Sequence, residues 1–161
     1  MESNLVLLLR KLSEAGVRFV VVDGIAAALH GVPCQTLDLD IVYARDPQNI
    51  ARLLSLLDEL EAIYRVQPEK KLRPSESHLA SKGHKNFVTS LGPLDLLGTI
   101  GDDWEYRDLE GSSDVFEIAD GLTVRALNLE TQIKIKEKLT GERDREILPL
   151  LRRALIEKQK R

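Results

Sequence analysis

The sequence is poor in the residues that build covalent or metal frameworks, with a single cysteine, Cys34, among its 161 residues. One cysteine excludes an internal disulfide framework and any zinc site made of several cysteines. Long apolar runs are also lacking: stretches such as Phe19–Val22 fall far short of the roughly 20 residues that a membrane-spanning helix needs. Met1 is followed by Glu2 and an amphipathic stretch rather than by a basic segment and an apolar core. We therefore expect no secretory signal, no membrane segment and a cytoplasmic location.

The composition is that of a soluble globular protein. Apolar residues make up 43% and charged residues 30% of the chain, and 161 residues suffice for about one domain, so we expect a single domain over residues 1–161. The net charge of −3 argues against bulk nucleic-acid binding. Residues 134–161 nevertheless hold ten of the 23 basic residues and five of the 26 acidic ones. This basic tail is either a solvated helix face or a cationic wall that faces an anionic ligand.

Hydrophobic periodicity and turn residues predict a mixed order of helices and strands. Helices are expected between Ser3 and Gly16, over 25–30, after Asp46, over 129–139, and over 142–157 with a start or kink at Pro149. Strands are expected over 18–22, 37–43, 86–90, 94–97, 115–118 and 122–126. Residues 67–85 are polar and predict a loop, and residues 102–113 give no clear pattern. The order predicts a single-domain α/β (α+β) fold, in which helices pack around a mixed sheet.

Two carboxylates are spaced for a common chemistry on one predicted strand. Residues two apart on a strand point to the same face, so Asp38 and Asp40 lie side by side while Leu39 faces the other way. Two like charges this close repel and raise each other's pKa, and a cation removes the conflict. Mg²⁺ is held by one or two carboxylates together with substrate phosphate oxygens, and two such ions assist phosphoryl displacement. A solvated edge strand that carries both aspartates is the alternative.

The segment before this strand predicts a phosphate site, and a later strand offers a third carboxylate. The strand that ends at Val22 runs through Gly24 directly into a helix, and backbone amides at such a turn bind anions. Asp95 alternates with Leu94 and Leu96 on a predicted strand, and a buried aspartate there is costly without a partner. The combination favours a nucleotidyl-transfer site.

Several short motifs resemble a known superfamily. Asp23-Gly24-Ile25-Ala26, His30-Gly31 and Thr36-Leu37-Asp38-Leu39-Asp40 resemble the signature of the polymerase β-like nucleotidyltransferases. The chain is more closely similar to the small prokaryotic enzymes of the minimal and AbiE type, with further matches at 94–98 and through the C-terminal third. The similarity extends over most of the chain and is weakest over 66–85.

The resemblance implies a fold, an activity and a set of site residues. The fold would be a mixed sheet packed by helices, and the activity transfer of a nucleoside monophosphate from an NTP to a hydroxyl of an unidentified acceptor. The cofactor would be Mg²⁺, with Mn²⁺ as an alternative. Six residues take on roles by transfer: Asp38, Asp40 and Asp95 as metal-binding and catalytic carboxylates, Gly24 and Lys136 at the nucleotide phosphates, and Thr36 as support for the metal strand.

Two departures from the family pattern keep a second function open. Asp23 stands where the family has its first glycine, and Cys34 stands where it has an arginine. Both changes make the site more negative. A catalytically degenerate protein that acts as a binding or regulatory partner, for example in a toxin–antitoxin pair, is therefore the alternative. An interaction domain with three surface aspartates is a third possibility, and the sequence leaves the oligomeric state open.

Overall fold

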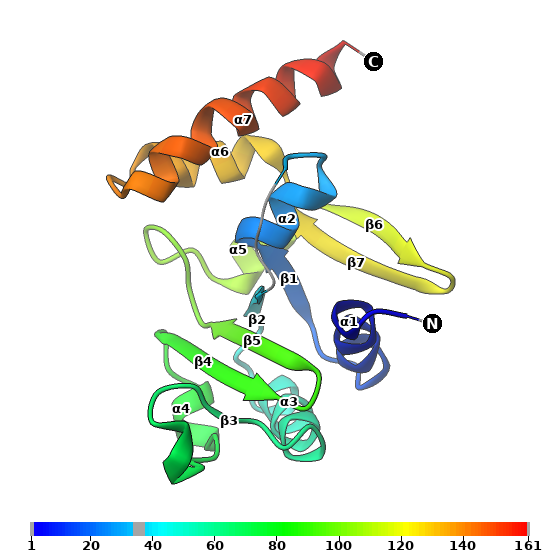
Figure 1. Ribbon diagram of the computed structural model, residues 1–161, viewed down its shortest axis with the longest axis vertical. Coiled ribbons are helices and arrows are strands. Elements are labelled where there is room, and N and C mark those ends of the chain that lie inside the picture. Colours follow the sequence, from blue (N-terminus) through cyan, green and yellow to red (C-terminus); the bar gives the residue numbers. More distant parts are fainter. Residues whose placement is uncertain (1, 34–37, 161) are drawn as a thin grey trace.

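Helices and strands alternate along the chain in the computed structural model, which describes residues 2–33 and 38–160 (Figure 1). The elements are α1 (Asn4–Glu14), β1 (Phe19–Val22), α2 (Asp23–Leu29), β2 (Leu39–Tyr43), α3 (Pro47–Glu59), β3 (Ile63–Tyr64), the 3₁₀ helix η1 (Pro68–Lys70), α4 (Glu76–Leu79), β4 (His84–Thr89), β5 (Gly92–Leu97), α5 (Tyr106–Glu110), β6 (Ser113–Ala119), β7 (Leu122–Leu127), α6 (Leu129–Glu137) and α7 (Glu142–Gln159).

A mixed sheet holds all of the named strands of the described residues in the order β3-β4-β5-β2-β1-β7-β6. The central strand β2 pairs antiparallel with β1 and parallel with β5, and β1 pairs parallel with β7. Hairpins β4–β5 and β6–β7 complete the two sides. The fold class is thus the predicted α/β arrangement, a mixed sheet packed by helices.

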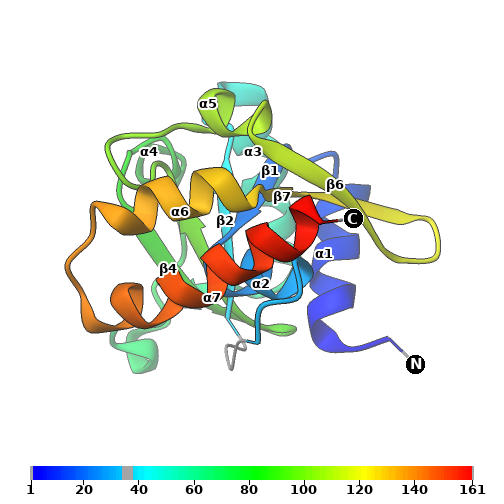
Figure 2. The same cartoon turned by 90° about the horizontal axis from the view of Figure 1, so that it is seen from above.

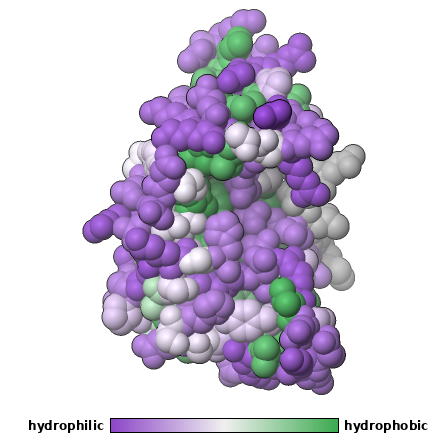
Figure 3. All heavy atoms as spheres, turned by 90° about the vertical axis from the view of Figure 1, so that its left-hand side faces the viewer, coloured by the Kyte–Doolittle hydropathy of each residue, from purple (hydrophilic) through white to green (hydrophobic). Residues whose placement is uncertain are grey.

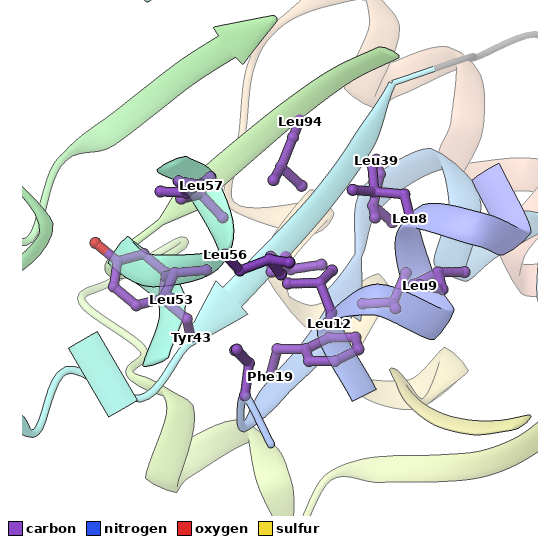
Figure 4. Packing of buried hydrophobic residues seen from close by; sticks show 14 of the residues in the cluster. Leu8, Leu9, Leu12, Phe19, Leu39, Tyr43, Leu53, Leu56, Leu57 and Leu94 are labelled. Atoms are coloured by element: carbon purple, nitrogen blue, oxygen red, sulfur yellow. The ribbon is translucent and has the colours of Figure 1, made fainter. Parts of the chain in front are cut away.

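One face of the sheet is covered by α1 and α3. Leu8, Leu9 and Leu12 recur at helical spacing on α1, and a similar apolar stripe on α3 includes Leu53 and Leu57. These side chains meet the alternate residues of the strands, as Figure 4 shows for Phe19, Leu39, Tyr43 and Leu94. Caps agree with the sequence: Ser3 accepts a hydrogen bond from the Val6 N–H, and Asp46 accepts one from the Asn49 N–H.

The opposite face of the sheet is covered by α5 and α6. Val20, Val22, Val42 and Leu97 of the strands pack there against residues that include Leu109 and Ile135. Helix α7 adds a further layer, since it packs on α6 and α2 through a third cluster around Leu151. Figure 2 shows α6 and α7 side by side above the sheet. The turn from β1 into α2, which begins at Asp23, therefore lies where the sheet, α2 and the C-terminal helices meet.

The structure agrees with most of the predicted elements and adds four short ones. Strand β3, the 3₁₀ helix η1 and helices α4 and α5 lie at residues 63–64, 68–70, 76–79 and 106–110, where the sequence predicted neither a helix nor a strand. Helix α7 runs from Glu142 to Gln159 with Pro149 inside it, which agrees with the helix expected over 142–157. Among the described residues no helix is long and apolar enough to cross a membrane.

Candidate active site

Asp40 and Asp95 lie directly opposite each other on neighbouring strands. Asp40 of β2 is in register with Val22 of β1 on one side and with Asp95 of β5 on the other. Leu39 and Leu94, which precede the two aspartates, are buried in the core under α1 and α3, so the aspartates belong to the other face. Asp38 directly precedes β2, and both Asp38 and Asp95 form an ion pair with Arg65. The structure thus brings the three predicted aspartates together.

The environment of Asp40 is unfavourable for a negative charge. Burial, a side-chain hydrogen bond with Asp95 and the nearby charges of Asp23, Asp95 and Asp38 raise the pKa of Asp40 to about 8. At neutral pH the Asp40 carboxyl is therefore mostly protonated, and its hydrogen bond with Asp95 is one cause of the raised pKa. Such a raised pKa in a group of convergent carboxylates is typical of a functional site.

An arginine that sequence reasoning missed holds two of the carboxylates. The Arg65 guanidinium forms an ion pair of 3.3 Å with Asp38 and a closer one with Asp95. Its position is fixed by the backbone, because the Arg65 N–H donates a 2.9 Å hydrogen bond to the Asn86 carbonyl beside the β3–β4 ladder. Asn86 is itself in register with Asp95. Sequence carried no signal for this contact, since β3 has only two residues and the partners lie 27 and 30 residues away.

The turn from β1 into α2 carries a fourth carboxylate in an unusual backbone conformation. Asp23 has a φ of 56°, in the left-handed region where glycine is favoured. Gly24 follows it in the first turn of α2, next to the start of β2. Aspartate tolerates this region better than most residues do, so it is accepted at a position where glycine would be favoured.

Lys136 is the second cation of the site. Its Nζ lies 3.0 Å from Asp23 and 2.9 Å from Asp144, so the lysine joins the β1–α2 turn to α6 and α7. Although burial favours the neutral amine, the two carboxylates raise the pKa of Lys136, and it stays charged. The sequence pointed to Lys136 but not to its partners. Thr36, which was expected to support the metal strand, and Cys34 lie outside the described residues.

The three aspartates are the right kind of ligand for a hard divalent cation, but their side chains are not arranged around a common metal position. Oxygen ligands from carboxylates are what Mg²⁺ prefers, and Asp38, Asp40 and Asp95 supply them at one place. Among the described residues, however, no three acidic, histidine or cysteine side chains already stand ready to hold a metal ion. The Arg65 guanidinium contacts one oxygen of Asp38 and one oxygen of Asp95.

A separate cavity of about 780 Å³ lies at the other end of α2. Its lining includes His30, Phe116, Leu150 and Arg153, and none of the three aspartates. Helix α2 has seven residues, so roughly 10 Å separates its two ends. The cavity is therefore distinct from the carboxylate site.

Figure 3 shows the side of the molecule that is on the left in Figure 1 as mostly hydrophilic, with apolar residues between its upper and lower parts.

Known proteins resemble this chain in fold rather than in sequence. No family model matches the chain, and no curated protein is significantly similar to it. The lincomycin-bound lincosamide antibiotic adenylyltransferase LnuA superposes with a TM-score of 0.63 at 14% identity, over 94% of this chain and 96% of that one. The antibiotic-resistance factor ANT(2'')-Ia gives a TM-score of 0.60 at 14% identity, over 94% and 82%.

A third solved structure extends the likeness beyond antibiotic resistance. The protein TM1012 of Thermotoga maritima, assigned as a nucleotidyltransferase, has a TM-score of 0.55 at 19% identity over 95% of this chain and 91% of that one. At such identities the likeness shows the fold alone. The chain therefore has the nucleotidyltransferase fold, as the motifs around Asp38 and Asp40 implied.

Proposed function

We propose that the protein is a divalent-metal-dependent nucleotidyltransferase that moves a nucleoside monophosphate from an NTP to a hydroxyl of an acceptor. The observation that carries the proposal is the register of Asp40 and Asp95 on adjacent parallel strands, with Asp38 beside them and the β1–α2 turn next to Asp40. The nucleotidyltransferase fold of the chain supports it.

Each side chain has a definite task in this proposal. Asp38, Asp40 and Asp95 would hold Mg²⁺ or Mn²⁺, which supplies Lewis-acid stabilisation of the phosphate oxygens when bound. Asp95, which is the least exposed of the ion-paired site carboxylates at 13%, would also accept the proton of the acceptor hydroxyl.

The nucleotide phosphates belong beside the β1–α2 turn. Gly24 has no side chain and lets a phosphate approach the backbone, and Lys136 offsets its charge. Catalysis of this kind is mostly positioning and electrostatic stabilisation. The names of two of the fold relatives refer to antibiotics, so small hydroxyl-bearing molecules are the first acceptors to try.

The decisive experiment compares the protein with Asp40→Asn. We expect one of the four NTPs, with Mg²⁺ or Mn²⁺, to raise the Tm of the protein by several degrees, because a ligand that binds only the folded state stabilises it by mass action. In Asp40→Asn the shift should vanish while the fold is kept. Asp58→Asn is the matched control, since Asp58 is exposed and pairs only with Arg73 in the described structure. Equal shifts in the protein and in Asp40→Asn would refute the proposal.

A specific observation also favours the alternative of a degenerate partner protein. Arg65 and Lys136 already neutralise part of the carboxylate charge, and Asp23 adds charge next to the expected phosphate position. A site that is balanced by its own side chains suits a protein whose fold serves binding, for example as one half of a toxin–antitoxin pair. Loss of every NTP-dependent shift, together with a small partner protein encoded by a neighbouring gene, would support this function instead.

A further inference from the structure

Arg65 takes up carboxylate oxygens that a divalent cation needs. Its two terminal nitrogens contact Asp38 Oδ2 and Asp95 Oδ1, on separate strands of the site. A metal ion binds carboxylate oxygens at about 2.0–2.1 Å in the case of Mg²⁺. A guanidinium hydrogen-bonded to one oxygen of each carboxylate repels a cation that approaches the same two groups. Metal and Arg65 therefore compete for Asp38 and Asp95.

The other cation of the site is not free to take part in this competition. Lys136 is held between Asp23 and Asp144, on the α2 and α7 side. Arg65, in contrast, forms ion pairs with both Asp38 and Asp95. The Arg65 side chain is 32% exposed. The backbone of Arg65 is held beside β4 by the hydrogen bond from its N–H to the Asn86 carbonyl, so the guanidinium can move away while the pairing of β3 and β4 is kept.

From these contacts we propose that Arg65 is an exchangeable counter-cation: it holds Asp38 and Asp95 in the free protein, is displaced when a divalent cation binds, and then contacts the anionic phosphates of the nucleotide. The inference rests on the proposed nucleotidyltransferase function. In this inference Arg65 positions the metal-binding carboxylates before the metal arrives, and it binds the triphosphate afterwards. Binding is then ordered, with metal favouring the state in which Arg65 is available to phosphate.

The test measures metal affinity without any turnover. Free Mn²⁺ is followed by electron paramagnetic resonance during titration of the protein, of Arg65→Gln and of Arg73→Gln. Arg73 lies in the neighbouring segment and pairs with exposed Asp58, so it controls for the loss of one positive charge. We expect Arg65→Gln to bind Mn²⁺ about 10-fold more tightly than the protein, because charge-assisted hydrogen bonds no longer compete. Arg73→Gln should change the affinity by less than about 2-fold.

The second half of the test adds the nucleotide. With Mn²⁺ saturating, the affinity for the best NTP should fall about 10-fold in Arg65→Gln, measured by calorimetry. Arg65→Lys should lie between the two, because lysine keeps the charge but lacks the planar fork that spans two carboxylates. Opposite effects on metal and nucleotide are not expected of a merely structural arginine, whose loss would weaken both.

The outcomes separate the inference from the proposed function. If the protein binds Mn²⁺ in an Asp40-dependent manner but Arg65→Gln binds it equally or more weakly, the inference is overturned and the proposed function stands. If neither the protein nor Arg65→Gln binds Mn²⁺, both are overturned. Should Arg65→Gln fail to fold by circular dichroism, Arg65→Lys decides, and an unchanged or weaker Mn²⁺ affinity in that variant overturns the inference.

Discussion

Asp23 shows how one residue accepts a backbone cost for the sake of a side-chain contact. Its φ of 56° costs a non-glycine residue roughly 1 kcal/mol, and less for aspartate or asparagine than for other residues. The carboxylate in return pairs with Lys136 at 3.0 Å and contributes to the raised pKa of Asp40. A glycine would remove the strain together with the pair.

Two substitutions at this position separate the backbone from the charge. Asp23→Asn keeps tolerance of the left-handed conformation and loses the charge, so we expect about 1 kcal/mol less stability. Asp23→Gly loses the same charge but relieves the backbone, and should be about 0.5 kcal/mol more stable than Asp23→Asn, since asparagine carries only part of the backbone cost. Urea unfolding with equal m-values measures the difference. Equal stability of the two variants would mean that the backbone at residue 23 is not strained.

At the scale of elements, long periodic segments were predictable and short ones were not. α1 and α3 carry apolar stripes together with caps at Ser3 and Asp46, and the β4–β5 and β6–β7 hairpins are marked by turn residues. β3 has two residues and α5 has five, too few for a period to be visible. Their existence depends on partners far along the chain, as β3 depends on β4.

The candidate site follows the same division. Asp38 and Asp40 were predictable because their spacing on one strand is local. Asp95 was predictable because its strand alternates. Arg65 was not predictable, because it contacts Asp38 and Asp95 across 27 and 30 residues of the chain, and no local pattern shows which strand its segment lies beside. The partners of Lys136 on α2 and α7 are likewise products of tertiary packing.

Helix α7 is attached to the site at its first turn by Asp144. The helix packs on α6 through apolar residues, and the Asp144 carboxylate contacts Lys136 Nζ at 2.9 Å. We expect Asp144→Asn to lower the free energy of unfolding by about 1 kcal/mol and to speed amide exchange in the first turns of α7, since a partly buried charge pair is broken. Hydrogen exchange followed by mass spectrometry measures this.

Glu142→Gln is the matched variant for α7. Glu142 shares the first helical turn and the favourable interaction with the helix dipole, but its side chain is exposed and away from Lys136. Its loss should change exchange in α7 only slightly. Equal effects of the two substitutions would assign the role of Asp144 to the helix dipole and not to the contact with Lys136.

For the whole molecule, two groups with opposite charges, the buried Lys85 and the half-buried Asp40, shape the pH dependence of stability. Burial first, and the Arg45 charge second, lower the pKa of Lys85 to about 8. Lys85 is only 1% exposed, and its ammonium donates to the Tyr43 hydroxyl and the Ser81 carbonyl. Asp40 is shifted the other way, also to about 8. Neither group is ionised in the folded protein as readily as in the unfolded chain.

Asp40 changes the stability with pH mainly below pH 8, and Lys85 mainly above it, and the two changes have opposite signs. Between about pH 4 and 8 the folded state binds more protons than the unfolded one at Asp40, so stability falls as the pH rises. Between about pH 8 and 10.5 the unfolded state binds more protons at Lys85, so stability rises with pH. Both penalties are close to complete near pH 8, where these two groups together predict a minimum in the free energy of unfolding.

Differences between variants isolate each contribution in urea unfolding at pH 5.5, 8 and 9.5. Relative to Lys85→Met, the protein should gain about 2 kcal/mol from pH 8 to 9.5, the worth of 1.5 pH units. Relative to Asp40→Asn, it should lose about 1 kcal/mol from pH 5.5 to 8, a smaller figure because solvent screens a partly exposed carboxyl. A Lys85→Met difference that does not change with pH would show that Lys85 keeps its ordinary pKa. A flat Asp40→Asn difference would mean that the carboxylates at the centre of the sheet do not strain the folded state, and that no cation is needed to relieve them.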